Sequence, residues 1–262
     1  MTIMSAEAST VIEYLDGLPA TQATDHALFG EVEYINLPRA QQIGGQFLAR
    51  NWVSIPHVTH HDDVDITDLE ILRQELSSTE GKAKVTMPVL LVKAIIEVLR
   101  QFPKFNASLD STGKRLCLKH YFNIGLAVDT PNGLLVPVIK NADKKRVDEI
   151  AVEFRELALA ARTKGLPMSA MEGGSFTLSS IGNLGGTAFT PIINAPEVAI
   201  LGATKAYWKP ERGTDDQLSW RLKLPLSLSY DHRVINGADA ARFLTAFDAV
   251  VRDAHSLVAP QQ

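Results

Sequence analysis

The chain has 262 residues, of which 45% are hydrophobic and 21% are charged, and its formal net charge is −4. This composition is typical of a globular enzyme with one large domain or two small ones. A slightly acidic chain without a basic face or basic tail argues against a nucleic-acid-binding protein.

The cysteine and the N-terminal charges bear on the compartment. The single cysteine, Cys117, excludes a disulfide within the chain, which fits a reducing compartment, and its apolar neighbours predict a buried structural thiol. Residues 1–38 contain no Lys or Arg, which argues against a targeting segment. No apolar run approaches the ~20 residues that span a bilayer. We expect a cytoplasmic bacterial protein; an imported organelle protein without its leader is the alternative.

The first 29 residues are weakly patterned, and we expect a flexible N-terminal arm with a short helix near residues 10–15. From residue 30 to 262 the hydrophobic pattern is dense, and no long linker interrupts it, which predicts one domain. Helices are predicted at 41–51, 69–76, 86–102, 147–164 and from about 237 to 251.

The middle of the chain has the composition of strands. Residues 116–129 and 134–140 flank Pro131-Asn132-Gly133, which predicts a hairpin. Further strands are predicted at 175–180, 197–204 and 222–230. The irregular order of strands and helices predicts an α/β or α+β layer with a mixed sheet, rather than a doubly wound sheet.

The densest polar group follows the strand predicted at 222–230. It consists of Asp231, His232 and Arg233, and a turn with Asn236 leads into the last helix. Polar side chains at the end of a buried strand are well placed to reach a cleft, and a histidine there can act as a general base near neutral pH. On this evidence alone, a structural and a catalytic His232 are equal alternatives.

A second polar segment ends the strand predicted at 175–180. Ser179 and Ser180 precede Gly182, and a hydroxyl at this place can donate a hydrogen bond to a developing oxyanion. The same residue types also form simple turns. Because successive side chains of a strand point to opposite faces, only one of the two serines is expected to face a cleft.

Three histidines, His57, His60 and His61, lie close to several aspartates. In an extended segment His60 and His61 point to opposite faces, and the spacing lacks a tetrahedral zinc signature. We therefore predict no metal site.

Eight separated segments together carry a family resemblance: RNW at 50–52, IPHVT at 55–59, DIT at 65–67, NIG at 123–125, VDTPNGL at 128–134, FTLSSIG at 176–182, INAPEVAILG at 193–202 and SYDHRVING at 229–237. In this order they resemble the catalytic domain of dihydrolipoamide acyltransferases, the core components of 2-oxo-acid dehydrogenase complexes, and most closely the bacterial pyruvate-complex type. The resemblance implies the coenzyme A-dependent acyltransferase fold of chloramphenicol acetyltransferase. In that fold a mixed sheet carries packed helices, and the trimer has intersubunit active sites.

The resemblance also implies the chemistry. An acyl group, acetyl by similarity to the pyruvate type, passes between dihydrolipoamide and coenzyme A in a channel between two subunits. His232 matches the histidine that takes the proton from the attacking thiol, and Ser179 matches the serine that stabilises the oxyanion. Asn236 stands where many members carry Asp, and we assign it positioning, because an amide is not a base. No residue is assigned to the nucleotide of coenzyme A.

Three supporting residues follow from the same segments. Asp231 and Arg233 are expected to form an ion pair that fixes the turn. By analogy, Arg50 is a candidate partner for the region of Asn236.

The implied partners are further copies of the chain in a homotrimer or in a larger cage, a lipoyl-bearing protein and other components of the complex. No lipoyl domain or partner-binding domain is visible before residue 30. We therefore expect either a stand-alone core or a fragment, whose lipoyl group is carried by another domain or chain. The alternatives are a largely structural trimeric or cage core, and an acyltransferase for a small non-lipoyl acceptor.

Overall fold

The computed structural model describes residues 24–78, 84–182, 184–213 and 216–258. It divides into two compact units, Met1–Leu37 and Pro38–Gln262. In the described part of the first unit, Asp25 caps a short turn of 3-10 helix, His26–Leu28. The helix expected near residues 10–15 lies outside the described residues, and the domain boundary expected after residue 29 stays a prediction.

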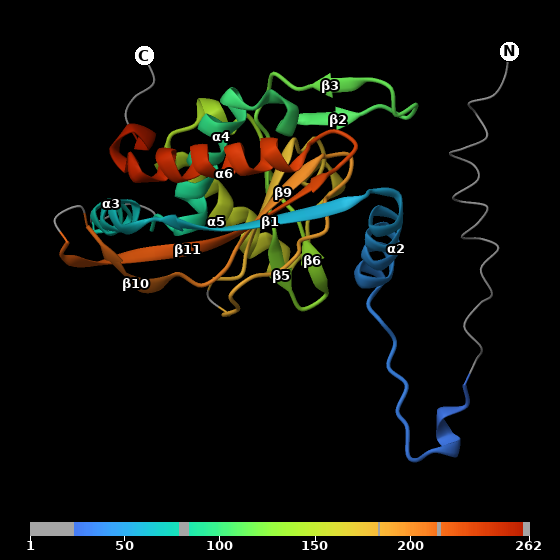
Figure 1. The fold of residues 1–262 in the computed structure, drawn as a ribbon. Coiled ribbons are helices and arrows are strands. Elements are labelled where there is room, and N and C mark those ends of the chain that lie inside the picture. Colours follow the sequence, from blue (N-terminus) through green and yellow to red (C-terminus); the bar gives the residue numbers. More distant parts are fainter. Residues whose placement is uncertain (1–23, 79–83, 183, 214–215, 259–262) are drawn as a thin grey trace, which may run out of the picture. The chain divides into compact units, whose positions relative to one another are not determined.

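A seven-stranded mixed sheet forms the centre of the second unit (Figure 1). Its order is β1-β11-β9-β8-β4-β7, and β10 pairs with β11. The strand β8 is parallel to β4 and β9, whereas the other pairs are antiparallel. The strands of this sheet are β1 His57–Asp65, β4 Ile124–Leu126, β7 Val138–Ile139, β8 Phe176–Ser180, β9 Ala199–Ala203, β10 Tyr207–Arg212 and β11 Leu218–Asp231. This order confirms the mixed sheet.

Four helices bury apolar residues in the same hydrophobic core as the sheet. They are α3 Thr67–Ser77, α4 Met87–Gln101, α5 Val147–Thr163 and α6 Gly237–Arg252. Leu226, Leu228 and Tyr230 of β11 point into this core as alternate residues of one strand. Figure 1 shows α6 beside α4, and the two helices contact each other. A further helix, α2 Arg39–Ser54, contacts the short strand β6 Gly133–Leu135.

The predicted helices are confirmed within a few residues at their ends. Of the helices in the described part of the chain, none has the length and apolar character needed to cross a membrane. Pro56 follows the end of α2, as expected from its inability to continue a helix.

Two local predictions were wrong. Cys117 is exposed, because β3 Leu116–Leu118 pairs only with β2 Ala107–Leu109 in a separate two-stranded ribbon. The segment 116–129 is also not one arm of a hairpin, because it divides among β3, β4 and β5 Val128–Thr130. The hairpin at the predicted turn is confined to β5 and β6 Gly133–Leu135. An apolar run does not reveal which sheet each of its parts joins.

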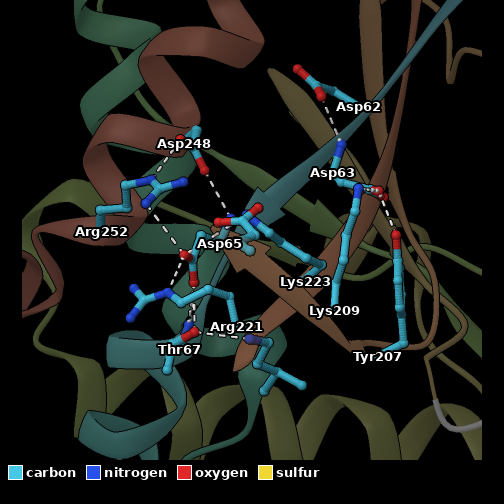
Figure 2. A network of polar contacts seen from close by, with 12 residues as sticks. Asp62, Asp63, Asp65, Thr67, Tyr207, Lys209, Arg221, Lys223, Asp248 and Arg252 are labelled. Carbon is cyan, nitrogen blue, oxygen red and sulfur yellow. Dashed lines mark hydrogen bonds and ion pairs between the residues drawn. The ribbon is translucent and has the colours of Figure 1, made fainter. Parts of the chain in front are cut away.

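The end of β1 is tied to three other elements by a polar network (Figure 2). The buried Asp65 carboxylate accepts hydrogen bonds from Thr67 Oγ1 (2.6 Å) and Arg221 Nε (2.6 Å), and Arg252 Nη1 lies 3.3 Å from it. The backbone N–H of Asp65 donates to Asp248 Oδ1 (2.8 Å). Burial raises the pKa of Asp65, but the hydrogen bonds from Thr67 and Arg221 outweigh it and hold this pKa at about 2. The network therefore joins β1 to α3, β11 and α6.

Candidate active site

His232 is the first residue after β11, and its side chain is exposed. Its backbone N–H donates to the carbonyl oxygen of Pro56 (3.1 Å). Its ring lies beside the buried ring of Tyr230, with 5.9 Å between the centroids. The carbonyl of Asp231 accepts two N–H groups of the turn that leads to α6, both at 3.0 Å. The imidazole thus faces solvent, and the hydrogen bonds of the His232 N–H and of the Asp231 carbonyl fix the backbone that carries it.

An ion pair fixes the start of this turn. The Asp231 carboxylate is buried and accepts hydrogen bonds from Arg233 Nη2 (2.6 Å) and Arg233 Nε (2.9 Å). The two-pronged contact raises the pKa of Arg233. The predicted ion pair of Asp231 and Arg233 is therefore confirmed.

Asn236 is the N-cap residue of α6. Its Oδ1 accepts a hydrogen bond from the backbone N–H of Asp239 (2.8 Å), so it satisfies one of the free donors at the helix start. This contact fixes the first turn of α6, four residues after His232. Arg50 lies over the Phe47 ring, 4.9 Å from its centre, and its pairing with the region of Asn236 stays a prediction.

Ser179 and Ser180 end β8 on opposite faces of the sheet. Phe176 points into the hydrophobic core, and strand alternation places Ser180 on the same side and Ser179 on the other. Ser179 is the register partner of Gly202. The ring of Phe189 occupies the place of a side chain there, because a Cβ on Gly202 would lie 2.6 Å from Phe189 Cζ. Ser179 therefore lies on the face that the core helices leave uncovered.

The structure does not bring Ser179 and His232 together within one chain. Ser179 pairs with Gly202, and Gly202 pairs in turn with Ser227 of β11. Ser227 precedes His232 by five residues, which is an offset of roughly 17 Å along the strand at about 3.4 Å per residue. A hydrogen bond between these two side chains of one chain is therefore excluded.

Two histidines of β1, His57 and His61, make contacts within the fold. His61 Nδ1 lies 2.9 Å from Ser227 Oγ, and the ring of His57 binds two backbone groups. Within the described residues, no group of three or more His, Cys, Asp or Glu is placed to hold a metal ion.

Sequence reasoning did not single out Glu197, which is almost fully buried. Burial raises its pKa to about 7, although Thr177, Lys119 and Asn194 each act in the opposite direction. The sequence feature that could have identified Glu197 is its position directly before the apolar run of β9. Acids at such positions are rarely left inside a core without a partner.

A family model for the catalytic domain of 2-oxoacid dehydrogenase acyltransferases matches residues 30–259. The chain belongs to this acyltransferase family. A relative from Cupriavidus necator, a dihydrolipoyllysine-residue acetyltransferase component of the pyruvate dehydrogenase complex, is 57% identical over 231 residues, or 87% of this chain and 41% of the relative. The corresponding Haemophilus influenzae component is 48% identical over 92% of this chain and 43% of its own length. The chain thus spans less than half the length of these relatives.

Solved acyltransferase structures agree with this assignment. The dihydrolipoamide acetyltransferase of Azotobacter vinelandii superposes with a TM-score of 0.87 at 47% identity, covering 92% of this chain and all of that one. Chloramphenicol acetyltransferase superposes with a TM-score of 0.54 at 17% identity, covering 81% of this chain and 95% of that one. The second match shows the shared fold. The coenzyme A-dependent acyltransferase fold expected from the sequence is therefore confirmed.

Proposed function

We propose that the chain is the catalytic part of a dihydrolipoamide acetyltransferase, which moves an acetyl group between dihydrolipoamide and coenzyme A. The Azotobacter vinelandii structure was solved to establish the roles of a serine, a histidine and an asparagine in the catalytic mechanism of that enzyme. The histidine and the asparagine there are four residues apart, as His232 and Asn236 are here. This spacing, on a turn that presents the imidazole and caps a helix, is the observation that carries the proposal.

The faces of the sheet decide which of the two serines, Ser179 or Ser180, is assigned to the oxyanion. The serine of the Azotobacter vinelandii enzyme precedes its histidine by 52 residues, whereas Ser180 and Ser179 precede His232 by 52 and 53 residues, so spacing does not separate them. Ser180 is on the face that carries the core helices, whereas Ser179 is on the opposite face. We therefore assign the oxyanion contact to Ser179.

The proposed reaction uses these groups in a fixed order. The imidazole of His232 takes the proton from the thiol of coenzyme A, and the resulting thiolate attacks the carbonyl carbon of the acetyl-dihydrolipoyl thioester. The hydroxyl of Ser179 donates a hydrogen bond to the tetrahedral oxyanion. Collapse of the intermediate breaks the bond to the lipoyl sulfur, which takes the proton from His232. The reverse reaction follows the same steps backwards.

The separation of Ser179 and His232 supports an active site between two subunits. A homotrimer provides such sites, with His232 from one protomer and Ser179 from its neighbour. A solved structure of the cubic core of a pyruvate dehydrogenase complex superposes with a TM-score of 0.87, which supports assembly of the trimers into a cage. We infer that the lipoyl group arrives from another domain or chain, that other components of the complex bind around the core, and that the enzyme works in the bacterial cytoplasm.

Acetyl transfer from acetyl-coenzyme A to free dihydrolipoamide tests the proposal. Replacing the base with His232→Gln is expected to lower kcat by about 10²-fold to 10⁴-fold, and Ser179→Ala by about 10²-fold to 10³-fold. The matched controls are His60→Gln and Ser180→Ala, which keep the wild-type rate. Equal rates for His232→Gln and His60→Gln would remove the proposed base.

The same assay separates the alternatives. A wild-type chain that assembles but transfers no acetyl group would support a largely structural core. Transfer to small alcohols or amines in preference to dihydrolipoamide would support an acyltransferase with a non-lipoyl acceptor.

A further inference from the structure

His57 is a polar side chain that the proposed reaction does not use, although it is the register partner of Asp231 and so lies beside the candidate base. Its ring Nε2 lies 3.0 Å from the backbone nitrogen of Ile193, and its Nδ1 lies 2.8 Å from the carbonyl oxygen of Ile55. A backbone N–H can only donate, so Nε2 accepts. Nδ1 therefore carries the ring proton and donates a hydrogen bond to the carbonyl oxygen of Ile55. Both ring nitrogens are used, and they hold two separate backbone segments.

The segment at Ile193 is held from a second side. Asn51 is buried in α2, and its Nδ2 donates to the carbonyl oxygen of Ile193 (3.0 Å). The side chains of Ile193 and Ile55 pack together in a small hydrophobic cluster. The side chains of Asn51 and His57 thus bind the backbone C=O and the backbone N–H of the buried Ile193, and together they fix its position.

The segment at Ile55 leads directly to the candidate base. Pro56 follows Ile55, and its carbonyl oxygen accepts the backbone N–H of His232 (3.1 Å). A chain of contacts therefore runs from Ile193 through the ring of His57 to Ile55, then through Pro56 to His232. Loss of the His57 ring would leave the Ile193 N–H and the Ile55 carbonyl without these partners and would free the peptide that holds His232.

We propose that His57 is a positioning residue, which fixes the Ile55–Pro56 backbone and thereby the place of the His232 imidazole. The inference rests on the proposed role of His232, but it concerns where that ring is held and not whether it reacts. It makes no use of His57 as an acid or a base, because both of its nitrogens are occupied by backbone groups. The expected result is a defect in the chemical step with little change in substrate binding.

Kinetics of variants at His57 test this inference. We expect His57→Ala to lower kcat by about 10-fold to 100-fold, with the KM of both substrates changed by no more than about twofold. Asn keeps a donor near the place of Nδ1, and Gln keeps an acceptor near the place of Nε2. Each of these two variants is expected to restore part of the lost kcat. The matched controls are the same three substitutions at His60, a histidine of the same strand on its other face.

A second measurement is independent of turnover. Diethyl pyrocarbonate modifies accessible histidines, and tryptic peptide 224–233 contains His232 as its only histidine. Mass spectrometry of this peptide is expected to show a modification rate that differs from wild type in the His57 variants and not in the His60 variants. A wild-type chain without transferase activity would refute the proposed function, yet this rate would still report on the position of the His232 ring.

The inference is overturned if folded His57 variants keep the wild-type kcat and the wild-type modification rate of His232. It is also overturned if KM rises while kcat is unchanged. Should His57→Ala fail to fold, the Asn and Gln variants decide by the same two criteria.

Discussion

Glu197 is a buried carboxyl group, and only one of its two oxygens has a hydrogen-bond partner. Its Oε1 lies 3.4 Å from Asn194 Nδ2, whereas Oε2 has no hydrogen-bond partner. A Cβ at Gly174 would lie 2.7 Å from Oε1, so a side chain at position 174 would displace the carboxyl group. Burial raises the pKa of Glu197 to about 7 from an ordinary value of 4.5. The protonated form, which carries no charge, is therefore favoured in this buried site.

This shift predicts how stability depends on pH. The folded protein binds the proton more tightly than the unfolded chain, so the contribution is fully present below pH 4.5 and is lost as pH rises to about 7. In the variant Glu197→Gln, the side chain at position 197 is uncharged at every pH. We expect the free energy of unfolding of wild type, relative to this variant, to fall by about 3 kcal/mol across that range.

Urea unfolding at several pH values measures this difference. The control is Glu172→Gln, which changes an exposed glutamate nearby and is expected to follow wild type at every pH. A difference between wild type and Glu197→Gln that does not change with pH would contradict the prediction.

At the scale of elements, the Asp65 network decides how the end of β1 meets α3, β11 and α6. Arg221, Lys223 and Arg252 surround the carboxylate, and the side chain of Lys223 is itself almost fully buried. An uncharged residue at position 65 would leave these cations without their shared anion. Because the pKa of Asp65 is held at about 2, the network keeps its charge at all but strongly acidic pH.

We therefore expect Asp65→Asn to lower the free energy of unfolding by about 3–5 kcal/mol. Thermal or urea unfolding of the variant measures this loss. Asp62→Asn, which changes an exposed aspartate on the same strand, is the control and is expected to stay close to wild type. A loss no greater than that of the control would show that the network is dispensable.

At the scale of the whole molecule, an active site shared between subunits makes a prediction about mixed trimers. His232→Gln chains keep Ser179, and Ser179→Ala chains keep His232. If each site takes one residue from each of two neighbours, random mixing of equal amounts gives roughly a quarter of sites with both intact residues. If each site lies within one chain, mixing the two variants restores no acetyl transfer activity.

Co-expression of the two variants with different affinity tags and purification through both tags would provide such trimers. Each trimer that carries both tags has two chains of one variant and one of the other, so one of its three sites joins an intact His232 to an intact Ser179. Their acetyl transfer rate per chain is therefore expected to approach about a third of the wild-type rate. Trimers that carry His232→Gln in one tagged chain and His232→Ala in the other serve as the control and stay inactive. A mixed trimer no more active than its parents would contradict the shared site.

The sequence by itself determined the five long helices and the strands β8, β9 and β11 of the described residues, and it pointed to candidate residues for the chemistry. Proline and glycine positions marked element boundaries, and a run of apolar, β-forming residues marked β11, because both depend on the local backbone. The polar group at 231–233 was visible for the same reason. The segments that resemble the family also led to His232, Ser179 and Asn236, since residues in a short motif keep their identity without any knowledge of the fold.

Only the tertiary structure decided which residues meet. Cys117 sits in apolar sequence but is exposed, because only the other residues of its ribbon, such as Ala107 of β2 and Leu116 of β3, pack on the core. The link from His57 to Ile193 spans 136 residues, and Glu197 became a buried acid through contacts from other strands and loops. The offset between Ser179 and His232 comes from strand register. Register and burial are properties of long-range packing, which a local pattern does not contain.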